Sequence, residues 1–458
     1  MSKKLFLSSL LSALLLQDII FADDLDMDLD GFDTEETLFD EPIDEADVEN
    51  REVEKEISPL AIGGSIAFKT AYGYRNHKVD GVEYEGFNQS QISFSAELDY
   101  KISKDWKLRI EADTYYDAIY DLRTKTDYND DVLDAYHTDI MLKDSYIQGS
   151  LSDDLDLKVG RQIVVWGKSD SIRITDVINP LDNRTPGMTD IEDLRLSVGM
   201  AKFDYYVGSW NISAMLIGEN RIMIEAPQNS EFFPIDTGMD LKKPDYDTDN
   251  LQYALAFNGI FSGWDLSFYG ANVLDSKWHI DTVTKTREVS TIGMLGSAIN
   301  IATGSWLLKS EVAFLSGIKY NSTTDEKNRL DMLVGFDYMG IKNTVLSLEV
   351  ADRHIFDYED KMNSKTEILK DYTDQDEVQT AIRASRTFLN ESIEVTTLVS
   401  MFGTSFENGG FVRVWSEIDI IDGVTSNVGV VDYVGGDNFF MDKVKDNDRV
   451  FADITYSF

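Results

Sequence analysis

The sequence predicts an all-β fold, a single transmembrane antiparallel β-barrel of about 18 strands, with 16 strands as the alternative. Apolar and polar residues alternate with a period of two along many segments. These segments run to roughly 10–14 residues, longer than most strands of globular proteins. Short and long connections alternate along the chain. Short turns on one side and long loops on the other are typical of barrels that cross a membrane.

Composition narrows the class of protein. The chain has 458 residues, a formal net charge of -41 and no cysteine. Nucleic acid is also a polyanion, so we expect no nucleic-acid partner. A chain without cysteine has no disulfide framework and no thiolate metal site. Because no histidine spacing, glycine-rich phosphate loop or Gly-x-Ser-x-Gly motif indicates a reaction, we predict no metal, no cofactor and no catalytic residue.

The N-terminal 22 residues have the pattern of a signal peptide. Lys3 and Lys4 precede an apolar run, and the pattern ends at Ala22, before an abrupt acidic stretch. The run is shorter than the roughly 20 apolar residues of a membrane-spanning helix, although an uncleaved anchor remains the alternative. The sequence therefore predicts that residues 1–22 direct secretion.

Residues 23–57 are rich in Asp and Glu and have few apolar residues. Such a segment buries too little surface to offset its ordering entropy, so we expect a disordered periplasmic tether. Asp26, Asp28 and Asp30 copy the start of a calcium-binding loop, but the twelfth position, which needs Glu, is Thr37. We predict a tether that attracts cations loosely, with specific calcium binding as the alternative.

The barrel is expected over residues 58–458, and its strands follow from the alternation. Apolar Phe94 and Leu98, for example, alternate with polar Ser95 and Glu97. The expected strands are 62–73, 88–102, 105–118, 138–151, 155–166, 195–207, 210–218, 250–261, 264–274, 290–302, 305–316, 328–339, 343–354, 377–389, 392–403, 409–419, 424–433 and 448–458. The expected long extracellular loops are 74–86, 119–137, 167–193, 219–249, 275–289, 317–327, 355–375 and 434–447; the turns at the other, periplasmic end are short.

The last strand ends on Phe458. A final strand that closes on the first leaves no open sheet edge, so no residue is needed beyond it. A C-terminal aromatic residue after such alternation resembles the signal that the barrel insertion machinery reads. We therefore expect two partners, outer-membrane lipid and that machinery, the latter through Phe458.

Charged side chains on the polar faces of the strands are expected in the lumen. Near the bilayer midplane a charge that faced lipid would cost about 2–4 kcal/mol. The expected lumen-facing residues are Glu97, Arg109, Glu111, Lys309, Glu349, Arg383 and Arg413. A barrel of this size is too wide for side chains alone to fill, so we predict a hydrated pore, with a packed salt-bridge plug as the alternative.

Residues 160–184 leave a strand but remain half apolar, through residues such as Ile172 and Ile178. Because a freely solvated loop would not contain so many apolar residues, we predict a loop near 167–193 that folds into the barrel and narrows the pore. An external loop packed on its neighbours is the alternative. The expected constriction residues are Arg161, Trp166, Lys168, Arg173, Asp176, Asn179, Asp182 and Arg184. The cations among them predict a preference for anionic solutes at this point.

Three parts of this stretch resemble the signature of a known family: Gly160-Arg161-Gln162, Trp166-Gly167, and Asp176 to Pro180 followed by Asp182. The family comprises uncharacterised Gram-negative outer-membrane barrels, is named only as a domain of unknown function and is often encoded near RND-type exporters. More distantly the arrangement is similar to alginate-export porins. The resemblance implies a channel for a lipid-like or poorly soluble compound and a periplasmic or RND-type transport partner, and it supplies no catalytic residue.

These observations together predict a function as well as a fold. We expect a porin-like channel of the bacterial outer membrane that transports small or amphiphilic solutes, coupled to an exporter in one version of the hypothesis, and we expect no enzyme activity. The alternative is an outer-membrane enzyme or adhesin built on a plugged barrel.

Overall fold

The computed structural model describes residues 59–234, 237–242, 244, 251–281, 284–321, 323, 325–363 and 373–458. The predicted signal peptide, residues 1–22, and the predicted acidic tether, residues 23–57, lie outside these ranges. No helix within the described ranges is long and apolar enough to cross a membrane.

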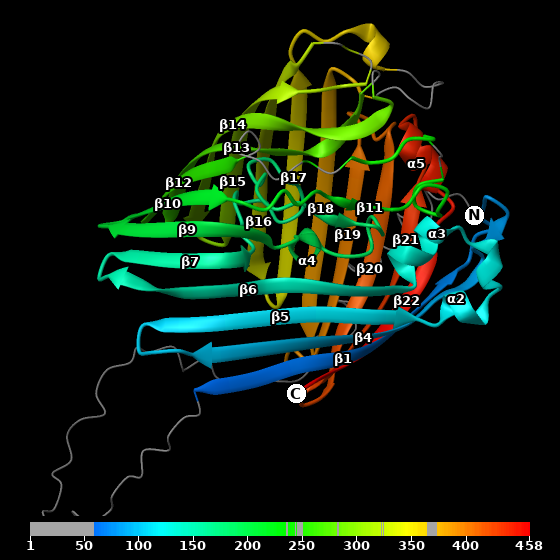
Figure 1. Ribbon diagram of the computed structural model, residues 1–458, viewed down its shortest axis with the longest axis horizontal. Helices are drawn as coiled ribbons and strands as arrows, with labels where there is room; N and C mark the ends of the chain where they lie inside the picture. Colours follow the sequence, from blue (N-terminus) through cyan, green and yellow to red (C-terminus); the bar gives the residue numbers. More distant parts are fainter. Residues whose placement is uncertain are drawn as a thin grey trace, which may run out of the picture. The chain divides into compact units, whose positions relative to one another are not determined.

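Eighteen antiparallel strands form one closed sheet, as the sequence predicts (Figure 1). The strands are β1 (Leu60–Gly73), β4 (Gly86–Lys101), β5 (Trp106–Asp117), β6 (Thr138–Ser152), β7 (Leu155–Gln162), β9 (Val198–Val207), β10 (Trp210–Ile217), β12 (Gln252–Phe261), β13 (Trp264–Asp281), β14 (Thr286–Thr303), β15 (Trp306–Ile318), β16 (Lys327–Ile341), β17 (Thr344–Ile355), β18 (Asp376–Phe388), β19 (Ile393–Phe402), β20 (Gly409–Ile421), β21 (Val424–Val434) and β22 (Arg449–Ser457). Each pairs with its neighbours in chain order, so the alternative of 16 strands is wrong.

The barrel closes between its first and last strands. β1 pairs with β4 on one side and with β22 on the other, in a register that joins Ser65 to Ser457. Phe458 continues this closure, because its backbone N–H donates to the carbonyl of Gly64 at 3.0 Å and its carbonyl accepts from the N–H of Gly64 at 3.1 Å. The terminal residue thus takes part in removing the open edge.

The outer face of the barrel is apolar. Along β12, for example, Tyr253, Leu255 and Phe257 are exposed, while the alternate residues Ala254 and Ala256 are buried toward the interior. Aromatic pairs such as Phe261 and Trp264, with ring centroids 4.3 Å apart, lie at the short-turn end. An apolar outer face with aromatic residues at its border is the surface that an outer-membrane barrel presents to lipid.

Two expected boundaries are wrong, and they concern the wall beside the site. The strand expected at 155–166 ends at Gln162, because the chain leaves the wall there. The long loop expected at 275–289 is instead hairpin structure, since β13 runs to Asp281 and β14 begins at Thr286.

Several of the expected loops carry short elements. These are β2 (Lys78–Val79), β3 (Val82–Glu83), α2 (Ile119–Leu122), η2 (Lys125–Asp127), α3 (Asp130–Tyr136), β8 (Asp182–Asn183), α4 (Ile191–Leu194), β11 (Ile224–Glu225), η4 (Asp360–Met362) and α5 (Phe439–Val444). Polar side chains begin two of the helices: the Asn129 side chain accepts from the N–H of Val132 ahead of α3, and Asn438 caps α5 in the same way. In chain order, β8 and β11 belong to the two long connections that build the site.

Candidate functional site: a segment latched inside the barrel

The connection between β7 and β9, residues 163–197, is here called the β7–β9 segment. It forms hydrogen bonds and ion pairs with side chains on the inner faces of β13, β15, β17, β18 and β20. Its partners lie at both ends of the barrel, since Asp265 is next to the start of β13 at the short-turn end and Asp139 begins β6 at the long-loop end. The segment therefore crosses the interior along much of its height.

Glu311 on β15 holds the first half of this segment through its carboxylate. Oε1 accepts from the backbone N–H groups of Lys168 at 2.6 Å and Ser169 at 2.8 Å. Oε2 accepts from the N–H of Thr175 at 3.2 Å and from its hydroxyl at 2.7 Å. Four donors converge on one buried carboxylate, and hydrogen bonds to charged groups are stronger than neutral ones.

Glu349 on β17 holds the adjoining residues in the same way. Its carboxylate accepts from the Ser169 hydroxyl at 2.6 Å and from the N–H groups of Asp170 at 2.9 Å and Ser171 at 3.1 Å. Lys309 lies between the latches: its ammonium pairs with Asp170, with Asp337 at 2.8 Å and with Glu349 at 3.8 Å. Glu311 and Glu349, here called the two latch carboxylates, therefore hold a run of backbone N–H groups that no regular element satisfies.

Gly167 permits the close approach of the segment to Glu311. Its φ of +88° lies in the left-handed region, and a Cβ there would stand 2.7 Å from Oε2 of Glu311. The preceding residue, Trp166, is buried and stacks on Tyr269 of β13 with ring centroids 4.7 Å apart. The Trp–Gly pair thus anchors the segment against one wall and lets its backbone turn toward the latch.

Asn179 closes the base of the segment. Its side-chain oxygen accepts from the N–H of Val164 at 2.8 Å, and its Nδ2 donates to the carbonyls of Gln162 at 3.2 Å and Leu196 at 2.7 Å. Val164 and Leu196 lie at opposite ends of the segment. One buried amide therefore joins the point where the chain leaves the wall to the point where it returns.

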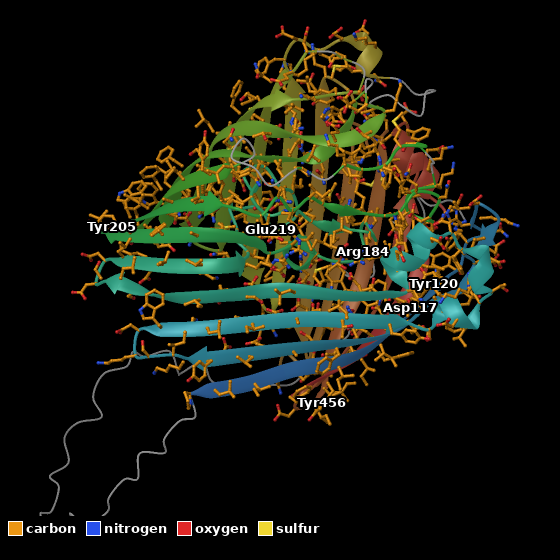
Figure 2. The ribbon with its side chains drawn as sticks, in the orientation of Figure 1. Asp117, Tyr120, Arg184, Tyr205, Glu219 and Tyr456 are labelled. Carbon is orange, nitrogen blue, oxygen red and sulfur yellow. The ribbon has the colours of Figure 1, made fainter. Side chains whose placement is uncertain are left out.

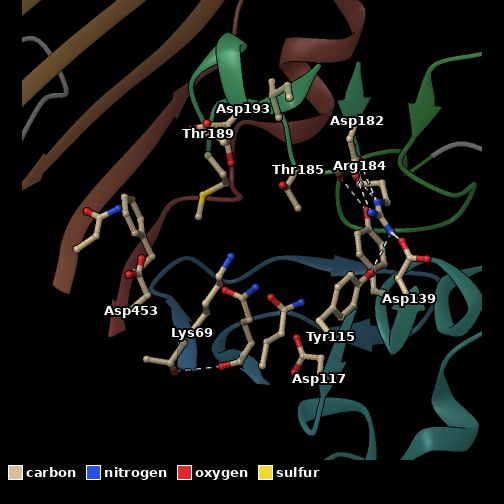
Figure 3. Close-up of a pocket in the computed structure, with 18 of the residues that line it drawn as sticks. Lys69, Tyr115, Asp117, Asp139, Asp182, Arg184, Thr185, Thr189, Asp193 and Asp453 are labelled. Carbon is tan, nitrogen blue, oxygen red and sulfur yellow. Dashed lines mark hydrogen bonds and ion pairs between the residues drawn. The ribbon is translucent and has the colours of Figure 1, made fainter. Parts of the chain in front are cut away.

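Asp176 and Arg184 organise the middle of the segment. Asp176 pairs with Arg173 at 3.1 Å and Arg195 at 2.8 Å, and burial lowers the pKa of Arg173 against the influence of that carboxylate. Arg184 pairs with Asp182 and, across the lumen, with Asp139 at 3.0 Å (Figure 3). Burial alone would lower the pKa of Arg184, but the hydrogen bond to Asp182 and the neighbouring carboxylates raise it overall.

Carboxylate partners neutralise the predicted cations. Arg161 pairs with Glu219, Lys168 with Asp265, Arg173 with Asp176, and Arg184 with Asp182 and Asp139. The anion preference expected from the sequence depends on unbalanced positive charge at this point. Asp176 and Asp182 belong to the same segment, whereas Glu219, Asp265 and Asp139 come from other parts of the chain, and the preference for anionic solutes stays a prediction.

The remaining predicted residues lie on the inner face of the wall. Arg109 pairs with Glu97 at 2.5 Å and approaches Glu111 at 3.8 Å, away from the segment. Arg383 and Arg413 both pair with Asp190, which precedes α4. The predicted set thus divides into a wall cluster around Arg109 and a group that contacts the β7–β9 segment.

A second connection also enters the barrel mouth. Residues 218–251 link β10 to β12 and are here called the β10–β12 segment. Its β11 pairs in parallel with β8 of the first segment. Farther along, Glu231 pairs with buried Arg449 of β22 at 2.9 Å, and Phe232 packs edge-on to Tyr433 of β21. The segment therefore reaches from β10 to the opposite wall.

Two chambers lie beside the β7–β9 segment. The polar chamber, about 490 Å³, is lined by charged residues from the wall, among them Lys69, Asp117, Asp139 and Asp453 (Figure 3). The apolar chamber, about 690 Å³, is lined by many apolar side chains. These include Ile174, Val177, Ile178, Leu274, Ile292 and Leu315. Thr189, Asp190 and Leu194 line both chambers, so the end of the segment lies between them.

Sequence reasoning missed several residues that build the site. Glu311 was not among the expected site residues, and Asp190, Glu219 and Glu231 lie in loops of an acidic chain where one carboxylate looks like any other. A signal existed for the second connection, because Phe232 and Phe233 are adjacent apolar residues in an otherwise polar stretch. Among the residues described by the structure, no group of three His, Asp or Glu side chains could hold a metal ion.

Comparison with known proteins supports the fold. The crystal structure of Pseudomonas aeruginosa OccD3 (OpdP) is similar over 87% of this chain and 91% of its own, with 10% sequence identity and a TM-score of 0.51. The outer membrane protein opdK from the same organism is similar over 87% of this chain and 99% of its own, with 9% identity and a TM-score of 0.49. The likeness to OccD3 shows the fold alone, a closed antiparallel β-barrel.

Sequence comparisons identify the family. No curated protein matches the chain. The model of one family, described as a protein of unknown function (DUF1302), matches residues 73–458, which include the β7–β9 segment, both latch carboxylates and nearly the whole barrel. The chain therefore belongs to the DUF1302 family of proteins of unknown function.

Proposed function

We propose that this protein is a porin-like channel of the bacterial outer membrane, and that the β7–β9 segment forms its constriction. The observation that carries the proposal is the latching of this segment across the lumen by Glu311 and Glu349, with a chamber beside it on either side. Inward loops held in this way set the radius and polarity of a pore. The constriction consists of the expected residues on the β7–β9 segment, which are Trp166, Lys168, Arg173, Asp176, Asn179, Asp182 and Arg184, together with the two latch carboxylates; the remaining expected residue, Arg161, belongs to β7 in the adjoining wall.

The solutes that suit this channel are small or amphiphilic. The apolar chamber has the volume of a site for a drug-sized molecule and combines apolar side chains with charged ones, among them Arg221 and Arg353. Coupling to an RND-type exporter, contact with the insertion machinery through Phe458 and tethering by residues 23–57 belong to the same proposal.

The test measures single-channel conductance in a planar bilayer. In the first variant, a Gly–Ser linker of equal length replaces residues 168–184, which removes Asn179 and its contacts and leaves the strands intact. The second variant replaces residues 168–176 only and so retains Asn179; its linker loses the ion pairs of Lys168 and Asp176 and the Thr175 hydroxyl contact to Glu311. Both variants should insert normally and conduct more than the parent, because a flexible linker with small side chains fills less of the lumen.

The outcomes separate the alternatives. Parent-like conductance in both variants would show that the segment does not limit the pore. A parent barrel that passes no steady current would contradict the proposed channel function. It would favour the alternative, an enzyme or adhesin built on a plugged barrel.

A further inference from the structure

Four short strands interrupt the barrel wall beside the apolar chamber. The β6–β7 ladder starts at Ser145 and Arg161, whereas β6 itself begins at Thr138. The β12–β13 ladder starts at Tyr253 and Asn272, whereas β13 runs on to Asp281. In Figure 1, β7 and β9 end well before β6, which continues to α3. The region above β7, β9, β10 and β12 is here called the wall notch.

Strand tilt does not account for this interruption. In a tilted barrel the strand ends shift steadily in one direction around the wall. Here the wall steps down from β6 to β7 and steps up again from β12 to β13. Within the described ranges, a step that reverses its direction marks a gap in the wall of strands. The notch lies at the long-loop end, which is the extracellular end of outer-membrane barrels, and so faces the outer leaflet.

The border of the notch combines apolar side chains with one ion pair. Ile140 on β6 is 83% exposed and Val165, just after β7, is 60% exposed. Between the short strands, Arg161 Nε donates to Glu219 at 3.1 Å, and the Arg161 Nη1 donates to the carbonyl of Leu142 on β6, also at 3.1 Å. Figure 2 places Glu219 beside the end of β9.

The ion pair stands in the outward-facing row of the wall. Arg161 pairs across the sheet with Ser145, which in turn pairs with exposed Ile110, and residues paired directly across strands share a face. A lone charge on the lipid face is costly, so a guanidinium–carboxylate pair there provides a polar point in an apolar surface. Such a pair can open without leaving the wall, because both partners sit at strand ends.

The apolar chamber adjoins this ion pair. Its lining includes Ile222, Met223 and Gln252 from the border of the notch. Gln252 Nε2 donates to the backbone carbonyl of Glu219 at 3.5 Å, so a residue of the chamber wall contacts one member of the ion pair through its main chain. Gln252 and the ion pair therefore lie on the path between the chamber and the outer face.

We propose that the wall notch is a lateral portal, through which an amphiphile with a charged head and an apolar tail moves between the apolar chamber and the outer leaflet, with Arg161 and Glu219 as its gate. This inference rests on the proposed channel function and names its substrate class. The apolar side chains of the chamber suit the tail, and charged side chains of its lining, such as Arg221 and Arg353, suit the head.

The experiment uses the absence of native cysteine. In the full-length Val165→Cys variant, a maleimide that carries a polyethylene-glycol chain is attached in detergent, and the protein is reconstituted into phosphatidylethanolamine–phosphatidylglycerol liposomes. Two rates are measured on the same liposomes: K⁺ flux, and uptake of a dansyl-labelled dodecyl sulfonate, whose permanent charge slows unaided crossing. The matched control is Val334→Cys with the same label, because Val334 on β16 is 63% exposed on the outer face, away from the notch.

The label at Val165 should reduce sulfonate uptake by at least about ten-fold and leave K⁺ flux within about two-fold, while the label at Val334 should change neither. The Arg161→Gln, Glu219→Gln double variant should raise sulfonate uptake. Unchanged sulfonate uptake with the label at Val165 would overturn the portal. An equal loss of sulfonate uptake and K⁺ flux would also overturn it, because it would indicate that the sulfonate and K⁺ share one axial path. An unlabelled protein without K⁺ flux would instead contradict the channel function on which the portal rests.

Discussion

At the scale of single residues, Glu311 and Glu349 use carboxylates to satisfy backbone N–H groups that a strand or helix would normally satisfy. A neutral amide at either position keeps the shape of the side chain but presents one oxygen in place of two, and its NH₂ group opposes the donors. The segment is therefore held by charge as well as by geometry.

Glu311→Gln should loosen the β7–β9 segment and increase both the mean and the fluctuation of single-channel current. Each lost hydrogen bond to a charged acceptor is worth about 1.5–3 kcal/mol. The matched control is Glu97→Gln, because Glu97 is a lumen carboxylate whose ion pair is to Arg109 on the wall. Equal current traces for the two variants would show that Glu311 is not a latch.

Val334 tests the assignment of the outer face at the same scale. Its side chain is 63% exposed on β16. Val334→Arg should lower the free energy of unfolding by about 2–4 kcal/mol if the residue lies near the midplane, because the guanidinium loses hydration in lipid. Leu122→Arg on α2 is the control, since Leu122 is 75% exposed in a loop. Urea unfolding in liposomes measures the free energy of unfolding of both variants. Equal decreases for the two variants would refute the assignment of Val334 to the lipid-facing surface.

At the scale of elements, the β10–β12 segment depends on one buried ion pair. Arg449 Nε also donates to the carbonyl of Asn447, and its guanidinium carbon lies 4.7 Å from the ring centroid of Phe232. Glu231 therefore holds a guanidinium that contributes both charge and packing. Removing one partner of a buried pair leaves the other charge without compensation.

Glu231→Gln should therefore destabilise the protein by about 3–5 kcal/mol, measured by urea unfolding. The control is Asp442→Asn, which breaks the exposed pair with Lys445 and should cost at most about 1 kcal/mol. If Glu231→Gln lowers the free energy of unfolding no more than the control does, solvent must reach Arg449.

The elements also show where the sequence stops being informative. Alternation predicts all 18 strands, because a side-chain period of two is a local property of the chain. Alternation fails to predict the end of β7. There the side chain of Asn179, 15 residues after Val164, accepts the Val164 N–H that would otherwise continue the ladder. It fails again at β13 and β14, whose polar upper halves read as loop although they pair as a hairpin.

At the scale of the whole molecule, the apolar character of residues 160–184 was enough to single out the segment, since apolar residues in a loop need something to pack against. Its partners could not be predicted, because they come from strands more than a hundred residues later in the chain. Period-two patterns fix the face of a residue but not its neighbour across the lumen.

This separation in sequence has a consequence for biogenesis. The bonds from Glu311 and Glu349 to the β7–β9 segment join residues 136 to 180 positions apart. Closing such long loops is slow and costs entropy that only later contacts offset. The segment must remain hydrated until β15 and β17 have been added to the growing sheet. The latched lumen is therefore among the last parts of the fold to form, and folding passes through a barrel whose β7–β9 segment is not yet held.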